Sequence, residues 1–462
     1  MPNCMRVWFG QTTSDAVAVP AETARAGCQA VGWSPVDTEA HAVDADTPDK
    51  HTPDKHTPDG SGSSESVLVR VTGPDHPGIT AGLMNVLANA GAEVHDIEQT
   101  VICGQLTLGL AVEVPQGRDL LKDVLLYGWE QGVAVDFDLV SSTPPSQLPG
   151  TVVTLLGPHL NPTEVGAAAT AIADAGANID RITRLSRYPV MSYELLVRDG
   201  DVGTLCSNLL RVATEHRTMD VAVQPEGIGR RAQRLIVLDV DSTIISGEVI
   251  DLLAAEAGCL EAVQEITAEA MAGVLDFEVS LRRRVALLAG LEEAAIERAH
   301  ANLRYTPGTR TFVRTLQRLG YTLAIVSGGF TAFTDRIAED LRIHHAHANV
   351  LEIVDGRLTG GLVGPIVDRA RKATLLREIA QANNVPLSQA VAVGDGANDL
   401  DMLKEAGLGI AFNAKPIVSE AADTTLSVPY LDAILFVLGI RREDVEAADR
   451  SDDHGNGDQN LA

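Results

Sequence analysis

The sequence is poor in aromatic residues and in positive charge, and both shortages restrict what it can be. Phe, Trp and Tyr make up only 4% of the 462 residues, so the core has to be built from Ala, Val, Leu and Ile, as in close-packed α/β domains. The 63 acidic residues outnumber the 36 basic ones, which gives a formal net charge of -27 at pH 7. A net negative charge of this size repels nucleic acid and anionic membranes, so we expect neither as a partner. A phosphorylated substrate would be repelled too, unless its site supplied a local cation.

Cysteines and long apolar runs are also scarce. The only cysteines are Cys4, Cys28, Cys103, Cys206 and Cys259, an odd and scattered set without C-x-x-C spacing. They predict reduced thiols in a cytoplasmic protein and not a disulfide framework or a zinc site. No apolar run approaches the ~18 residues of a membrane span, and the N-terminal region lacks the basic and apolar parts of a secretory signal.

Both ends of the chain have compositions that do not build a core. Residues 1–66 include a repeated T-P-D-K-H sequence and then a Gly/Ser-rich stretch, which together predict a disordered tail. Residues 441–462 are polar and acidic, and they predict a flexible tail at the other end.

Two similar segments follow the first tail, at 67–145 and 150–226. In the first, a strand-like run at 66–71 leads through a turn to a helical pattern that Gly91 ends. The second repeats this order from residue 151, with one residue inserted in the turn. The order predicts a tandem duplication of a βαββαβ unit, an α+β sandwich of one sheet and two helices.

The turn of the first copy reads Asp75-His76-Pro77-Gly78-Ile79. The bare backbone of a glycine there would let a ligand carboxylate approach the N–H groups that open the helix. In element order, length and this turn, both copies resemble ACT domains, which are small amino-acid-sensing modules. The resemblance implies an amino-acid effector, such as L-serine, at Asp75 and Gly78. The second copy lacks this glycine, so a packing role alone is open for it, and a structural or dimerising pair is the alternative for both copies.

From Leu235 the pattern changes to short apolar strands that alternate with helices. Strands are predicted at 235–238, 322–326, 390–393 and 408–411. Because these runs are continuously apolar, they predict a parallel sheet with helices on both faces. We assign residues 234–440 to this α/β domain, with a helical insertion at about 245–305.

Reactive side chains directly follow three of these strands. Asp239 and Asp241 come after the first strand, Ser327 and Gly328 after the second, and Asp395 after the third. The carboxyl ends of parallel strands meet at one edge of a sheet, so these groups are expected to lie together. Two neighbouring carboxylates repel each other unless a cation or a proton lies between them. Each segment taken singly is also typical of a polar capping turn.

A cation and further oxygen ligands complete the set. Lys372 stands at a charged helix start, where a single lysine is usually solvated, and Asn398 and Asp399 follow Asp395. Together these residues supply carboxylates, a hydroxyl group, a positive charge and the hard oxygen ligands that Mg²⁺ prefers.

This combination resembles the haloacid dehalogenase-like phosphatases over roughly Leu235 to Gly439, and among them the phosphoserine phosphatases. The resemblance implies a Rossmann-like fold in which Asp239 is the nucleophile that becomes phosphorylated and Asp241 is the general acid and base. Mg²⁺ would be held by Asp239, Asp395 and the backbone carbonyl of Asp241. The groups that would hold the phosphoryl group are Ser327, Gly328, Lys372 and Asn398, with Asp399 in support.

The insertion at about 245–305 resembles the helical cap of that family. The resemblance implies that Glu248 binds the substrate ammonium, that Arg284 binds its carboxylate, and that Met271 and Phe277 pack over them. One anion and one cation at close quarters suit an amino-acid head group. The alternative is that Met271 and Phe277 are core residues of a cap helix and that Arg284 belongs to a solvated basic run with its two neighbours.

The implied activity is hydrolysis of O-phospho-L-serine to L-serine and phosphate, the last step of serine synthesis, in a homodimer tuned by an amino acid. Two alternatives stay open. One is a related phosphatase or phosphotransferase that acts on another small monoester, such as phosphothreonine, or uses homoserine as acceptor. The other is an amino-acid sensor that carries an inactive phosphatase fold.

Overall fold

The computed structural model describes residues 65–114, 120–139, 150–232, 234–271 and 275–457. These residues form two compact units, one with the described residues of the first repeat (65–114 and 120–139) and one with the remaining described residues. Most of the predicted N-terminal tail, residues 1–64, lies outside the described residues, but Glu65 and Ser66 already belong to the first strand. Within the described part, no helix combines the length and the apolar character needed to cross a membrane.

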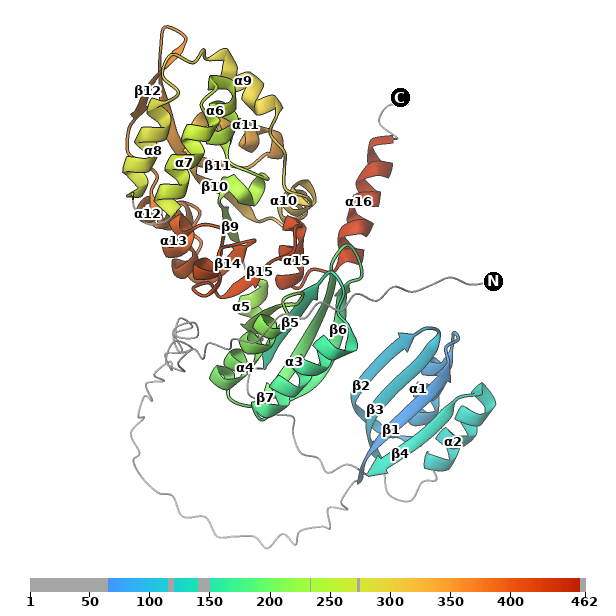
Figure 1. Cartoon of the computed structure of the whole chain (residues 1–462). Helices are drawn as coiled ribbons and strands as arrows, with labels where there is room; N and C mark the ends of the chain where they lie inside the picture. Colours follow the sequence, from blue (N-terminus) through green and yellow to red (C-terminus); the bar gives the residue numbers. More distant parts are fainter. Residues whose placement is uncertain (1–64, 115–119, 140–149, 233, 272–274, 458–462) are drawn as a thin grey trace, which may run out of the picture. The chain divides into compact units, whose positions relative to one another are not determined.

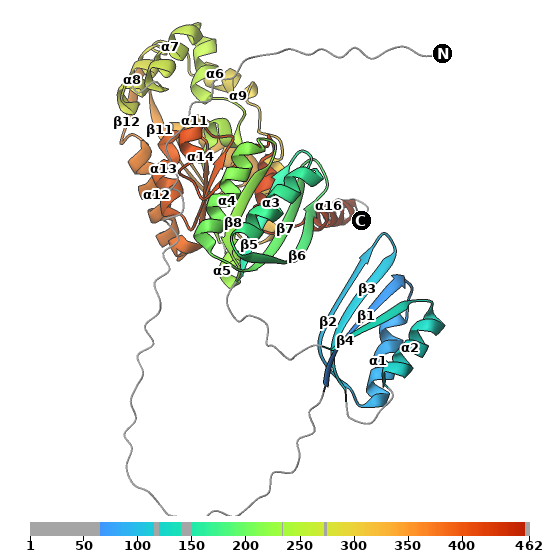
Figure 2. The ribbon, with the colours of Figure 1, turned by 60° about the horizontal axis from the view of Figure 1, so that its bottom comes forward.

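The unit with the first repeat has the order βαββαβ. Its elements are β1 (Glu65–Pro74), α1 (Ile79–Ala90), β2 (Glu93–Ile102), β3 (Gln105–Val114), α2 (Leu120–Gln131) and β4 (Ala134–Leu139). The strands form an antiparallel sheet in the order β2-β3-β1-β4, and both helices cover the same face of it (Figure 2). Every second residue of β3, from Leu106 to Val112, is buried beneath these helices, as the pleat of a half-covered sheet requires.

The second repeat has the same order of elements in the other unit. They are β5 (Thr151–Gly157), α3 (Pro162–Asp174), β6 (Ala177–Ser186), β7 (Met191–Asp199), α4 (Val202–Glu215) and β8 (Asp220–Pro225). Here β5 is the central strand, paired antiparallel with both β7 and β8. The tandem duplication that the sequence indicates is therefore visible as two copies of one topology.

The α/β part of this unit is built on parallel strands, as the continuous apolar runs predict. They are β9 (Leu235–Leu238), β10 (Thr322–Phe330), β11 (His345–Val354), β13 (Ala390–Gly394), β14 (Leu408–Phe412) and β15 (Thr424–Leu426), with an antiparallel β12 (Arg357–Val363) beside β11. Leu235 and Val237 of β9 pack with α12 (Arg369–Ala382) and α13 (Leu400–Glu405). Ile236 and Leu238 pack on the opposite face with α10 (Thr309–Arg318) and α11 (Thr331–Leu341). Both faces are thus covered, and β9 lies in the interior of the sheet.

The two sheets of this unit are continuous, which the sequence did not indicate. Strand β15 pairs antiparallel with β8 of the second repeat, at Thr424 and Ala222, so that eleven strands form one sheet. The carboxylate of Asp220 accepts hydrogen bonds from the backbone N–H (2.8 Å) and the hydroxyl (2.5 Å) of Ser427. The second repeat is therefore attached to the sheet of the α/β part by backbone pairing and by partly buried hydrogen bonds.

Four helices occupy the predicted insertion: α6 (Val249–Ala257), α7 (Leu260–Met271), α8 (Phe277–Ala286) and α9 (Ala294–Ala301). They gather at one end of the α/β part (Figure 1), and the hairpin of β11 and β12 reaches up to them. Backbone hydrogen bonds join Gly290 to Leu358 and Glu293 to Gly356, which tie these helices to the hairpin.

The prediction of a flexible tail at 441–462 is wrong for most of its length. Residues Arg442–Gly457 form the helix α16, and only 458–462 lie outside the described residues. The polar composition led to the wrong prediction because a few specific contacts, which composition does not reveal, hold this helix in place. Val445 is buried, Arg442 pairs with Asp432 at 2.6 Å, and Asp449 accepts hydrogen bonds from two arginines of α10.

Candidate active site

Strand β9, in the middle of the parallel strands of the α/β part, determines the position of Asp239. All four residues of β9 are fully buried, and the backbone N–H of Asp239 donates to the carbonyl of Val393 on the neighbouring β13 (2.9 Å). The carboxylate is therefore held at the carboxyl edge of the sheet and is only 3% exposed. Burial raises its pKa well above the ordinary value, and Asp399 adds to this, while Lys372 opposes it.

Asp241 lies in the tight turn after β9 and faces the end of β10. Its carboxylate accepts one hydrogen bond from the backbone N–H of Val249 (2.8 Å) and another from the hydroxyl of Ser327 (3.1 Å). Burial raises the pKa of Asp241, although these two hydrogen bonds and the charges of Lys372 and Arg284 act against the shift. A carboxyl group with a raised pKa can hold a proton near neutral pH and release it again.

Lys372 is the positive charge beneath the site. Its ammonium is fully buried and lies 2.8 Å from the carboxylate of Asp239 and 2.7 Å from that of Asp399. It comes from the first turn of α12, whose N-cap residue Asp368 accepts a hydrogen bond from the N–H of Arg371. Burial alone would lower the pKa of Lys372, but the two carboxylates raise it above the ordinary value.

Three carboxylates converge where β9 and β13 end. One oxygen each from Asp239, Asp395 and Asp399 lies within 4.8 Å of the others. Asp399 is fixed by a hydrogen bond from the N–H of Gly396 (3.0 Å), and burial followed by the charge of Asp399 raises the pKa of Asp395 to about 7. The chain passes close by at Gly394, where a β-carbon would lie 2.4 Å from the Asp399 carboxyl carbon, so only glycine fits. One buried ammonium cannot balance three carboxylates, and this excess of hard oxygen ligands suits a divalent cation such as Mg²⁺.

A pocket of about 590 Å³ opens above these carboxylates. Residues of the sheet edge and of the helical insertion line it together, including Asp239, Asp241, Glu248, Thr267, Phe277, Arg284, Gly328, Asp395, Asn398 and Lys415. Ser327 and Lys372 are fully buried below it. Of the other predicted residues, Met271 ends α7, but its side chain lies outside the described structure.

Glu248 and Arg284 meet in this pocket, 3.8 Å apart at their closest oxygen and nitrogen. Arg284 is only 8% exposed, whereas Arg282 and Arg283 are exposed, so just one of the three adjacent arginines faces inward. Burial, followed by the charge of Asp241, raises the pKa of Glu248, and Arg284 lowers it. Phe277 packs against the backbone of Gly328, where an added β-carbon would come within 3.1 Å of its ring.

Sequence reasoning missed Thr267 and Lys415 in this pocket and gave Asp399 only a supporting place. Thr267 stands one helical turn before Met271 on α7, but this spacing alone does not distinguish a pocket residue from the other residues of the helix. Lys415 comes from the loop after β14, and nothing in its local sequence distinguishes it from a solvated lysine.

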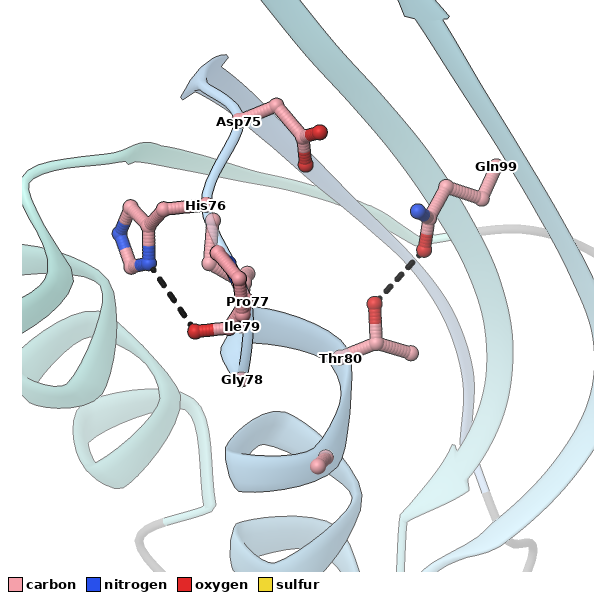
Figure 3. A pocket seen from close by; sticks show the side chains of 8 residues that line it. Asp75, His76, Pro77, Gly78, Ile79, Thr80 and Gln99 are labelled. Atoms are coloured by element: carbon pink, nitrogen blue, oxygen red, sulfur yellow. Dashed lines mark hydrogen bonds between the residues drawn. The ribbon is translucent and has the colours of Figure 1, made fainter.

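A second pocket, of about 400 Å³, lies in the first repeat at the start of α1 (Figure 3). It is lined by residues 75–81 and by Gln99, whose side-chain oxygen accepts a hydrogen bond from the hydroxyl of Thr80 (2.6 Å). Gly78 precedes the helix with φ 102°, a left-handed conformation that favours glycine, and no side chain caps the helix there. The N–H groups of this helix start therefore face the pocket together with Asp75.

The corresponding place in the second repeat is closed by its own side chains. The Asn161 side chain accepts from the N–H of Glu164 (3.0 Å), and the Glu164 carboxylate accepts from the N–H of Asn161 (2.9 Å) and the hydroxyl of Thr218 (2.5 Å). Glu164 is only 4% exposed. A carboxylate of the chain itself thus occupies the helix start that the first repeat leaves open.

Comparison with known proteins agrees with this arrangement. Residues 236–404 match the family model of haloacid dehalogenase-like hydrolases, and residues 65–138 and 150–224 each match an ACT domain model. The fold is therefore that of a haloacid dehalogenase-like hydrolase with two ACT domains, as predicted.

Relatives that match along most of their length identify a more specific family within these hydrolases. The chain is 51% identical to a phosphoserine phosphatase of Streptomyces coelicolor, over 85% of this chain and 97% of that one. It is 48% identical to a phosphoserine phosphatase of Mycobacterium tuberculosis, over 84% and 96%. A solved probable phosphoserine phosphatase of Vibrio cholerae superposes with a TM-score of 0.52 at 33% identity, covering 65% of this chain and 89% of that one. The chain belongs to the phosphoserine phosphatase family.

Proposed function

We propose that this enzyme hydrolyses O-phospho-L-serine to L-serine and inorganic phosphate, the last step of L-serine biosynthesis. The observation that carries the proposal is that one pocket joins the carboxylates suited to phosphoryl transfer with the Glu248–Arg284 pair. A free amino-acid head group presents an ammonium and a carboxylate a few ångströms apart, and this pair offers one opposite charge to each.

The first half of the reaction transfers the phosphoryl group to the enzyme. A carboxylate oxygen of Asp239 attacks phosphorus, the bond from phosphorus to the seryl oxygen breaks, and Asp241 gives its proton to that oxygen, which leaves as L-serine. The burial that raises the pKa of Asp241 favours the protonated form that this step needs.

The second half returns the enzyme to its initial state. Water attacks the phosphorus of phospho-Asp239, the ionised Asp241 accepts a proton from the water, and the acyl-phosphate bond breaks to release phosphate. The hydroxyl and backbone groups of Ser327 and Gly328, together with Asn398 and Lys372, would bind the phosphoryl oxygens in both halves.

Mg²⁺ fits the charge and the chemistry of the carboxylate cluster. Asp239, Asp395 and Asp399 offer side-chain oxygens, and the backbone carbonyl of Asp241 is a further candidate ligand. When bound, the ion neutralises phosphoryl charge that would otherwise repel the nucleophile.

The remaining parts of the proposal concern assembly and location. We divide the chain into ACT domains at 67–145 and 150–226 and a catalytic domain at 234–440 with its helical cap at about 245–305. A homodimer formed with help from the ACT domains is supported by the exposed apolar side chains of α2, such as Leu125 (48%) and Trp129 (79%). Cys103 and Cys259 are free cysteines, and the described residues hold no disulfide framework built on them, which suits a cytoplasmic enzyme.

Replacement of the head-group residues tests the substrate. In Arg284→Ala, kcat/KM for phosphoserine should fall about 10- to 100-fold, because the variant loses a hydrogen bond between two charged groups, and such a bond stabilises the transition state by about that factor. Glu248→Ala should lose as much for phosphoserine, and it should also lose activity towards phosphoethanolamine, which keeps the ammonium but lacks the carboxylate. Steady-state rates with both esters measure this.

The matched control for this test is Arg283→Ala, because Arg283 is the exposed neighbour of Arg284 and should leave both rates unchanged. A parent enzyme whose kcat/KM for phosphothreonine or phosphoethanolamine equals or exceeds that for phosphoserine would contradict the proposed substrate and favour a phosphatase for another small monoester.

The two ACT domains should differ in effector binding. Titration calorimetry with L-serine on Arg284→Ala, in which product binding at the catalytic pocket is weakened, should give one site per chain, in the first domain, because Glu164 already fills the helix start of the second. Asp75→Asn should weaken this binding about tenfold or more and alter the response of turnover to serine. His159→Ala, at the matching position of the second domain, is the control. Two sites per chain, or binding that Asp75→Asn leaves intact, would be evidence against the assignment.

A further inference from the structure

Arg284 is a buried cation with few partners of its own. Its guanidinium donates one hydrogen bond, from Nη1 to the hydroxyl oxygen of Thr267 (3.3 Å), and its nearest carboxylate oxygen, on Glu248, is 3.8 Å away. The buried Nε has no hydrogen-bond partner among the described residues. A guanidinium has five N–H donors, so most of its hydrogen-bonding capacity remains for a ligand.

Thr267 lines the same pocket as Arg284 and is held in place by a hydrogen bond of its own. It lies on α7, and its own hydroxyl donates to the backbone carbonyl of Val263, one turn earlier (2.9 Å). Because that proton is committed, the hydroxyl oxygen faces Arg284 as an acceptor. The hydrogen bond joins a side chain of α8 to one of α7 and lies in the pocket wall.

The separation of Arg284 from Glu248 matters for binding. At 3.8 Å the two groups attract each other but lie beyond hydrogen-bond distance. A guanidinium without another anchor would move onto the carboxylate and form a direct bidentate pair. Each group would then satisfy the other, and the ammonium and carboxylate of a substrate would have to break that pair first.

We propose that Thr267 is a positioning residue that holds the Arg284 guanidinium apart from Glu248 and directs its free N–H groups to the substrate carboxylate. This inference rests on the proposed function, because it assumes that Arg284 binds an amino-acid head group. It concerns a residue that acts through Arg284 and not on the reacting phosphoryl group.

The test compares phosphoserine with p-nitrophenyl phosphate, a monoester without a head group. In Thr267→Val, which keeps the shape but removes the acceptor, the selectivity for phosphoserine, as the ratio of kcat/KM values, should fall about tenfold. The loss should appear in KM and leave kcat nearly the same, because the contact is equal in ground and transition states. Thr267→Ser, which restores the hydroxyl, should regain most of the selectivity.

A double-mutant cycle shows whether Thr267 acts through Arg284. Thr267→Val combined with Arg284→Ala should lose no more selectivity than Arg284→Ala alone. Fully additive losses, a silent Thr267→Val, or a Thr267→Ser that fails to restore selectivity would each overturn the positioning role while Arg284→Ala still has its effect. If Arg284→Ala itself leaves selectivity intact, the proposed function fails, and the role of Thr267 fails with it. Thermal unfolding shows that each variant is folded.

Discussion

Asp239→Asn should abolish phosphate release from phosphoserine, with a loss of about 10³-fold or more, because an amide cannot form the acyl-phosphate intermediate. The position of Asp239 at the end of β9, 2.8 Å from the Lys372 ammonium, makes it the nucleophile of the proposed mechanism. Acid quenching after mixing with ³²P-labelled phosphoserine should trap a labelled protein in the parent and none in the variant. The trapped label reports transfer of the phosphoryl group to Asp239, and phosphate release reports the complete reaction.

The same variant should be at least as stable as the parent in metal-free buffer. The folded state raises the pKa of Asp239, so an ionised Asp239 at neutral pH makes folding less favourable, and a neutral asparagine removes that penalty. An asparagine oxygen can still accept a hydrogen bond from Lys372. Lost activity with an unchanged or higher melting temperature would therefore point to chemistry, whereas lost activity with a large drop in melting temperature would point to misfolding.

This experiment also tests the alternative hypothesis that the protein is an amino-acid sensor with an inactive phosphatase fold. Such a protein would show neither turnover nor a labelled intermediate in the parent. Activity in the parent that persists in Asp239→Asn would instead falsify the assignment of the nucleophile and direct attention to the other buried carboxylates.

The catalytic sheet could be predicted because its strands are continuously apolar and end in distinctive residues. Asp239 follows Leu238 directly, and Asp395 stands between two glycines after β13. Sequence order alone brings such residues to one edge of a parallel sheet. The choice of Arg284 among three arginines rested on resemblance, and burial in the structure now separates it from Arg282 and Arg283.

Other features depend on contacts between distant segments and left no local pattern. The pairing of β15 with β8 involves one residue pair, Thr424 with Ala222, and ordinary strand sequences on both sides. Thr267 became visible as a pocket residue only once α7 and α8 were packed together. The helix α16 has the composition of a tail, and its fixed place depends on Val445 and on arginines more than 100 positions away.

Lys372→Met should both inactivate the enzyme and destabilise it strongly. The ammonium is fully buried between Asp239 and Asp399, and Asp395 completes a carboxylate cluster whose ion pairs among the described residues are both made by Lys372. Breaking a buried ion pair by removing one partner typically costs about 3–5 kcal/mol, which for a domain of this size lowers the melting temperature by about 10 °C. Loss of a charge that stabilises the transferring phosphoryl group should reduce kcat by a further 10²- to 10³-fold, roughly the effect of one oxyanion donor.

The measurement has to report on the catalytic domain. The three tryptophans are Trp8, Trp33 and Trp129, none of them in that domain, so far-UV circular dichroism or calorimetry is needed in place of tryptophan fluorescence. Lys404→Met is the matched control, because Lys404 is an exposed lysine on α13. Mg²⁺ should stabilise Lys372→Met more than the parent, since a bound cation relieves the repulsion that the lost ammonium had balanced. A Lys372→Met variant that melts within about 2 °C of the parent, with or without Mg²⁺, would contradict this prediction. It would show that the carboxylates become protonated when the ammonium is removed and that Lys372 contributes to catalysis but not to stability.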